Sequence, residues 1–101
     1  MRVLQHRRQS GSRRDAVVAR ALRALPRLPR PCAFVAGTAA WLHGVDVLPP
    51  GVDERVWPLQ AALTRRPPTL VLDVEPRYWR IDAVDVCVVD GLPTTTPERT
   101  L

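Results

Sequence analysis

The residues that could ligate a metal ion or act as nucleophiles are few and far apart in this chain. Cys32, His43 and Cys87 are isolated from one another and match no zinc-binding spacing. The possibility that Cys87 is a nucleophile and His43 its base stays open. However, Cys87 lies in an alternating apolar run that is typical of a structural cysteine. We therefore expect no catalytic residue, no metal and no cofactor.

The carboxylates form no convincing acid–base or metal-binding pair. Most of them lie at predicted strand ends or on solvent-facing positions, as Asp82 and Asp85 do. The chain has no glycine-rich phosphate loop either. The residue types and their spacing thus favour a binding protein over an enzyme, and we expect no small-molecule substrate.

Arginine is the abundant chemistry-bearing residue. The formal net charge is +5, the sequence pI is about 10.9, and no lysine occurs. The guanidinium fork matches phosphate geometry, so double-stranded DNA is an expected partner of the N-terminal arginines. A solvated helix face would give the same pattern, and a GC-rich genome would also favour arginine over lysine. The expected phosphate-binding residues are Arg7, Arg8, Arg13, Arg14, Arg20 and Arg23.

The elements that position these arginines are an arm and a helix. Residues 1–11 are predicted to be a flexible basic arm, and residues 12–31 a basic helix followed by a proline-rich connector. Ser12 and Asp15 resemble a capping box, and Pro26 ends the helical pattern, which predicts a helix from Ser12 to Leu25. Arg20 and Arg23 are expected opposite an apolar face made of Val17, Val18, Ala21, Leu22 and Leu25.

The segment Gly37–Gly44 predicts a short buried helix at Thr38–His43. Thr38 can cap its start, and Gly44 can supply the left-handed residue that ends it. Trp41 is expected in the core, and His43 at the carbonyl end of the helix dipole.

Alternating periodicity in the second half predicts an α+β fold with a small, mainly antiparallel sheet. Leu70–Glu75, stopped by Pro76, and Ala83–Val89 are predicted strands. Cys32–Ala36 is either a strand or the buried approach to the central helix, and Leu59–Leu63 is interpreted as a short helical turn.

Two further clusters suggest interactions. The run Arg77-Tyr78-Trp79-Arg80 could stack a nucleic-acid base or cover a sheet edge. Thr96 and Pro97 are typical of a helix start, and the sequence ends at Leu101, where that helix would begin. Arg99 would oppose the dipole of this helix, so we expect it to pair with Asp90 or Asp46.

Two segments resemble motifs of the AbiEi-type antitoxins, which belong to type IV toxin–antitoxin, abortive-infection systems. Gly37–Gly44 (GTAAWLHG) is similar to one family motif, and Gly91–Leu101 (GLPTTTPERTL) is similar to another that continues into a helix. The resemblance implies that residues 32–101 form an antitoxin-like α+β domain, truncated at its C-terminus. Its structural or partner-binding residues would be Gly37, Thr38, Ala40, Trp41, His43, Gly44, Gly91, Pro93, Thr95, Pro97 and Arg99.

The resemblance implies a non-enzymatic antitoxin whose partner is a cognate nucleotidyltransferase-type toxin, with DNA-binding transcriptional regulation as a second role. Too few residues precede Gly37 for the winged helix-turn-helix that usually begins such proteins. Two alternatives stay open: a truncated connecting domain of a restriction-endonuclease-like protein, and a degenerate gene product without activity.

The sequence also indicates the cellular compartment in which the protein is expected. The basic N-terminus is not followed by the apolar stretch of a secretory signal, and no apolar run reaches the ~18 residues of a membrane span. A cytoplasmic protein with reduced thiols and no membrane partner is expected.

Overall fold

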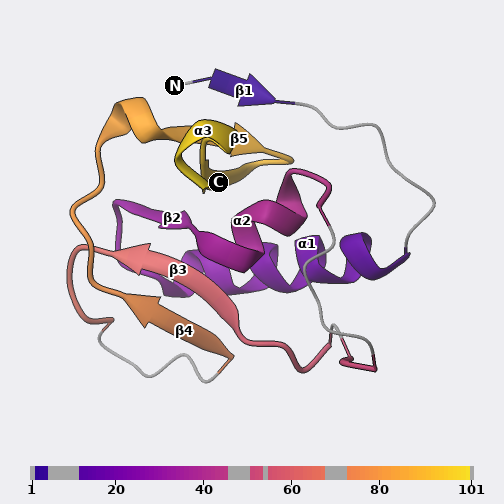
Figure 1. The fold of residues 1–101 in the computed structure, drawn as a ribbon. Helices are drawn as coiled ribbons and strands as arrows, with labels where there is room; N and C mark the ends of the chain where they lie inside the picture. The colour runs from indigo at the N-terminus through magenta and orange to yellow at the C-terminus, as the bar shows by residue number, and fades with distance from the viewer. Residues whose placement is uncertain (1, 5–11, 46–50, 54, 68–72, 101) are drawn as a thin grey trace.

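The computed structural model describes residues 2–4, 12–45, 51–53, 55–67 and 73–100 (Figure 1). The helical elements are α1 (Ser12–Ala24), η1 (Leu25–Arg27), α2 (Ala36–Leu42), η2 (Ala83–Asp85) and α3 (Pro97–Thr100). The strands are β1 (Arg2–Leu4), β2 (Cys32–Phe34), β3 (Leu59–Leu63), β4 (Val74–Arg77), β5 (Val86–Val89) and β6 (Leu92–Thr95).

The strands form one sheet in the order β1-β5-β6-β2-β3-β4, which runs from top to bottom in Figure 1. Pairs β2–β3 and β5–β6 are antiparallel, whereas β1–β5, β2–β6 and β3–β4 are parallel. The α+β class is confirmed, but the prediction of a mainly antiparallel sheet is wrong. Parallel pairs arise because β2 and β6, like β1 and β5, are far apart in the chain and are not joined by a hairpin turn.

A two-residue turn at Asp90-Gly91 joins β5 to β6. Both residues have positive φ angles, 50° and 81°. Asp-Gly is the dipeptide that favours this kind of hairpin turn, because glycine and aspartate tolerate the left-handed region. The turn sets the register that pairs Val89 with Leu92 and Cys87 with Thr94.

The core lies between the sheet and the two longer helices. Side chains from one face of the strands, including Phe34, Leu59 and Leu63, pack with Val17 of α1 and Trp41 of α2. Because α1 contributes to this core, the basic helix and the residues after position 32 fold around the same apolar interior. On the opposite face, the chain between β4 and η2 lies over the small side chains of Ala33, Val35 and Ala62.

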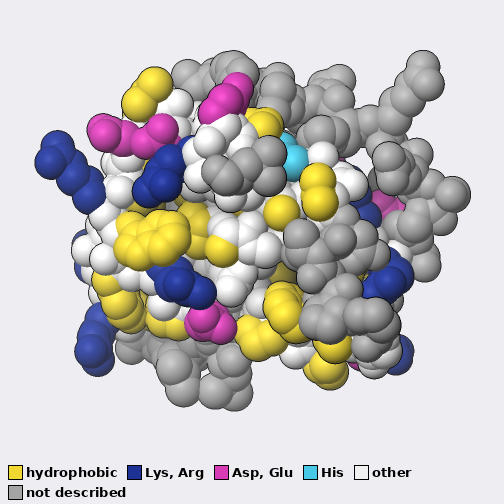
Figure 2. Space-filling model, in the orientation of Figure 1, with side chains coloured by type: hydrophobic (Ala, Val, Ile, Leu, Met, Phe, Trp, Pro, Cys, Tyr) yellow, Lys and Arg dark blue, Asp and Glu magenta, His cyan; other side chains and the backbone are white. Residues whose placement is uncertain are grey.

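The crossover from β4 to β5 carries exposed aromatic residues. Figure 2 shows basic side chains bordering an apolar patch on this side of the molecule. The guanidinium carbon of Arg77 lies 5.9 Å from the ring centroid of Trp79, which is a cation–π distance. Trp79 lies beside Ala33 and Ala62 of the sheet. For Trp79, this placement favours the interpretation that it covers the sheet over the interpretation that it stacks a nucleic-acid base.

The central helix is confirmed, but its cap differs from the prediction. α2 begins at Ala36, and Thr38 does not cap it; Thr38 Oγ1 instead accepts a hydrogen bond from the Gln60 backbone N–H at 2.8 Å. Gly44 has φ 94°, as predicted. The N–H groups of Gly44 and Val45 donate to the carbonyls of Trp41 and Ala40, which completes a Schellman motif.

Several strand predictions need correction. Leu59–Leu63 is a strand and not a helical turn, because its apolar residues are buried between β2 and β4. Pro76 does not stop β4 but lies within it, which a proline can do because β4 is an edge strand. Residues 70–72 lie outside the described part of the chain.

The boundaries of the other predicted elements also shift. Ala83–Asp85 is a short 3₁₀ helix, so the strand predicted from Ala83 begins at Val86. Cys32–Phe34 takes the strand alternative. Arg2–Leu4, within the predicted flexible arm, pairs with β5 as an edge strand, while residues 5–11 lie outside the description.

The helix predicted over Ser12–Leu25 is confirmed as α1 with η1 after it, but its faces were partly misassigned. Leu22 is exposed and Arg20 is buried, the reverse of the prediction. The described part of the chain contains no helix that is both long and apolar enough to cross a bilayer.

Replacing Trp41 with alanine should destabilise the protein by roughly 3–5 kcal/mol, because a large side chain that is 4% exposed would leave a cavity. The matched control is Trp79→Ala, since the Trp79 side chain is 41% exposed, and it should cost much less. Urea unfolding followed by circular dichroism measures both, and equal losses for the two variants would contradict the burial of Trp41.

Candidate functional site around the two motif segments

The structure brings the two motif segments together. His43, at the end of α2, donates from Nε2 to the carbonyl of Thr95, at the end of β6, at 2.7 Å. The two residues are far apart in the chain, and this bond links α2 directly to the strand that precedes α3. Gly37–Gly44 and Gly91–Thr100 therefore form a single structural cluster.

The start of α3 is held by a small threonine network. Thr96 is the N-cap, and its hydroxyl accepts from the Arg99 N–H at 3.4 Å, as predicted, with Pro97 at the first helical position. Thr100 Oγ1 donates to the Thr96 carbonyl at 2.9 Å and lies 2.7 Å from Thr95 Oγ1. The hydroxyls of this motif thus satisfy one another and nearby carbonyls.

A buried arginine ties the same cluster to α1. Arg14 is 7% exposed, and its Nη2 donates to the Leu42 carbonyl at 2.7 Å and to Asp90 Oδ2 at 2.8 Å. The Leu42 carbonyl lies at the C-terminal end of α2, where the helix dipole favours a cation. One guanidinium therefore contacts α2 and the β5–β6 turn from the first turn of α1.

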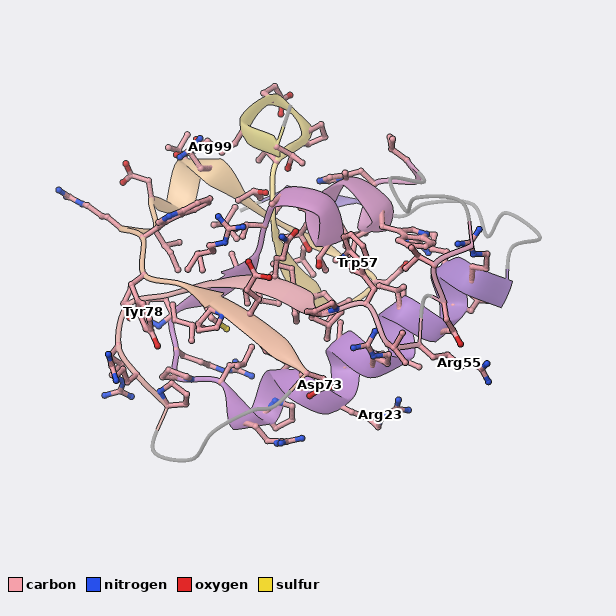
Figure 3. The ribbon with its side chains drawn as sticks, turned by 60° about the horizontal axis from the view of Figure 1, so that its bottom comes forward. Arg23, Arg55, Trp57, Asp73, Tyr78 and Arg99 are labelled. Carbon is pink, nitrogen blue, oxygen red and sulfur yellow. The ribbon has the colours of Figure 1, made fainter. Side chains whose placement is uncertain are left out.

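The predicted phosphate-binding arginines do not form one exposed face. Arg20 is 7% exposed, donates to the Trp57 carbonyl at 2.7 Å and lies 3.9 Å from Asp73 Oδ2. Arg13 is half-buried, with its guanidinium carbon 5.4 Å from the ring centroid of Trp41. Arg23 is exposed (Figure 3), whereas Arg7 and Arg8 lie outside the described residues.

Arg14 and Arg20 therefore make internal contacts, and the structure does not place them on the exposed helix face that was predicted for them. Their positions on α1 point toward the core, but their long side chains reach carbonyls and carboxylates at its edge. Hydrogen bonds to these oxygens offset the cost of burying each charge.

The predicted ion pair of Arg99 has a different partner. Arg99 Nε lies 4.0 Å from Asp85 Oδ2, and both side chains are partly exposed. Asp90 is instead engaged with Arg14, and Asp46 lies outside the described residues. Such a long, solvated pair contributes little to stability.

The two cysteines are buried free thiols on separate strands, Cys32 on β2 and Cys87 on β5. Burial raises the pKa of the Cys32 thiol, and the nearby Arg30 charge partly opposes that shift. The thiol is therefore the protonated, poorly nucleophilic form at neutral pH. Among the described residues, no three of the His, Cys, Asp and Glu side chains are grouped so as to hold a metal ion.

Comparison with known proteins adds no support to the family resemblance. No family model, curated protein or solved structure matches this chain. What the arrangement can do must therefore be argued from its own contacts.

Sequence reasoning missed the roles of two residues that organise the site. Asp90, expected as a partner of Arg99, instead anchors Arg14, and the Asp-Gly dipeptide between two apolar runs was the signal that could have placed it in a turn. Gln60 Oε1 accepts from the Gly37 N–H at 2.8 Å at the start of α2. No local pattern indicates that contact, because it depends on β3 lying beside α2.

Replacing Arg14 with methionine should destabilise the fold by roughly 1–3 kcal/mol, because the Leu42 carbonyl and Asp90 would each lose a charged donor. Arg23→Met on the exposed side of the same helix should stay within about 0.5 kcal/mol of the original protein. Urea unfolding at neutral pH measures the difference; a harmless Arg14→Met variant would show that the buried contacts are not needed.

The raised pKa of Cys32 predicts a pH dependence of stability. The folded state holds this proton more tightly than the unfolded state, so the stabilisation is complete below the ordinary thiol pKa of 9.0. It should be lost as pH rises from there through the higher folded pKa. The free energy of unfolding should therefore fall more steeply at alkaline pH for the original protein than for Cys32→Ala. Parallel pH profiles would contradict the assignment.

Proposed function

We propose that this chain is an antitoxin-like, non-enzymatic binding protein of a type IV toxin–antitoxin system. The observation that carries the proposal is the contact between the two motif segments, made by His43 and Thr95. Two motifs that occur in the family's order also pack against each other, which supports a common structural role for them.

The polar groups of the motifs support a binding role over catalysis. His43 Nε2 is bonded to Thr95, Thr38 accepts from the Gln60 N–H, and Thr100 donates to Thr96. These groups are used to connect α2, β3, β6 and α3 to one another. The motif residues thus hold these elements in one arrangement, which supports a role in presenting them to a partner.

Repression of transcription through α1 is not part of this proposal. Arg14 and Arg20 are buried in internal contacts, and Arg13 packs on Trp41. Among the described arginines expected to contact DNA, this leaves Arg23 exposed on the helix. Among the described residues of this set, one exposed side chain alone offers few phosphate contacts, so α1 itself gives little support for duplex binding.

The proposal predicts that the chain restores growth to cells that express a nucleotidyltransferase-type toxin. The toxin should be taken from the genes adjacent to this one and placed under a separate promoter. Growth arrest by the toxin alone, relieved when this chain is co-expressed, is the expected result. The exposed-site variant Arg55→Gln should rescue growth equally well, and the destabilised Trp41→Ala variant should rescue less.

Undiminished arrest in the presence of abundant, folded chain would contradict the antitoxin role. If the adjacent DNA then continued the same reading frame into a nuclease-like domain, the connecting-domain alternative would replace it. Measuring the folded level of the chain by circular dichroism after purification from the same cells separates a functional failure from a folding failure.

A further inference from the structure

A basic hollow lies close to the C-terminal end of α1, beside the proline-rich connector. Its cavity volume is about 620 Å³, and the connector and the loop after β3 both contribute to its wall. Four arginines line it, Arg27, Arg30, Arg65 and Arg66. None of these was among the arginines expected to bind DNA.

The four guanidinium groups are available to a ligand. All four residues are exposed, and within the described part of the chain no carboxylate forms an ion pair with any of them. Like charges that converge on one hollow repel each other, and an anion placed between them would relieve that repulsion. The guanidinium fork makes phosphate a well-matched anion.

An apolar hollow adjoins the basic one. Its cavity volume is about 220 Å³, and Leu28 and Arg66 line both hollows. Tyr78, which is 53% exposed, forms part of its wall together with Val74 and Pro76. The volume is below the roughly 300–1,000 Å³ of small-molecule pockets, so it suits one flat ring rather than a whole ligand.

We propose that these adjoining hollows bind single-stranded nucleic acid. Phosphates contact Arg27, Arg30, Arg65 and Arg66, and one unpaired base packs against Tyr78 in the apolar hollow. A positively charged groove beside an aromatic ring is the combination by which proteins hold single strands without reading their sequence. Duplex is disfavoured because its bases are stacked and paired, so none is available to the ring. This site does not depend on the antitoxin proposal.

Fluorescence anisotropy of a labelled oligothymidylate, titrated with the full chain over a series of salt concentrations, tests the site. For single strands each phosphate contact contributes about −0.7 to the slope of log K against log salt, so four contacts predict a slope near −2.8. The double variant Arg65→Gln/Arg66→Gln should flatten that slope by about 1.4. Both residues are exposed in a loop, so the fold should be retained.

Loss of the aromatic contact should change the affinity differently from loss of the arginines. Tyr78→Ala should weaken binding roughly 5- to 150-fold at constant salt while leaving the salt slope unchanged. Tyr78→Phe keeps the ring and should bind nearly as well as the original protein. Arg55→Gln is the control for loss of a surface arginine away from the site, because Arg55 is exposed and lies at the opposite end from Tyr78 in Figure 3. It should change neither the affinity nor the salt slope.

Three results would overturn the proposal. One is no binding of the oligonucleotide at low salt by a protein whose circular dichroism shows it folded. Another is equal affinity for a duplex of the same length with no effect of Tyr78→Ala, which would indicate unspecific charge attraction. The third is binding to anionic phospholipid vesicles, abolished by Arg65→Gln/Arg66→Gln, in place of binding to the oligonucleotide.

Discussion

The arrangement of the motif segments depends on the hydrogen bonds that the buried guanidinium of Arg14 makes with α2 and with the β5–β6 turn. The guanidinium is a buried charge, and burying a charge is costly unless oxygens surround it. Here the Leu42 carbonyl at the end of α2 and the Asp90 carboxylate of the β5–β6 turn both accept from Nη2. The requirement for two acceptors fixes where α1 can lie relative to α2 and to the hairpin. His43 then connects α2 to Thr95, so α1, α2, β6 and α3 are held in one arrangement.

Strong local signals predicted part of this fold from the sequence. The left-handed Gly44 and the Thr96-Pro97 cap follow from backbone chemistry that acts within a few residues. The short strands were harder, because Leu59–Leu63 carries no alternation when both of its faces are buried. Its identity as a strand depends on β2 and β4, which are separated from it in the chain. Parallel pairing of β2 with β6 is likewise a long-range feature that local periodicity does not encode.

Charge patterns on α1 were a poor guide to the surface, for a physical reason. An arginine side chain is long enough to start at a core-facing position and still place its charged end beside an oxygen at the edge of the core. Arg14 and Arg20 do this, while Leu22 on the same helix is exposed. The arginines that converge on a surface hollow come from the connector and from the loop after β3. Neither segment is periodic, so only the tertiary fold brings them together.

The central claim is that the basic helix and the two motif segments form one cooperative unit held by buried contacts. Native-state hydrogen exchange tests it directly, by comparing amides of α1 with those of α2 and β6, which carry the two motif segments. The account predicts that the Ala21, Leu42 and Leu92 amides exchange with the same free energy, equal to that of global unfolding, because all three residues belong to one core. Exchange of the α1 amides through an opening of much lower free energy would contradict it, since the helix would then detach while the sheet stayed folded.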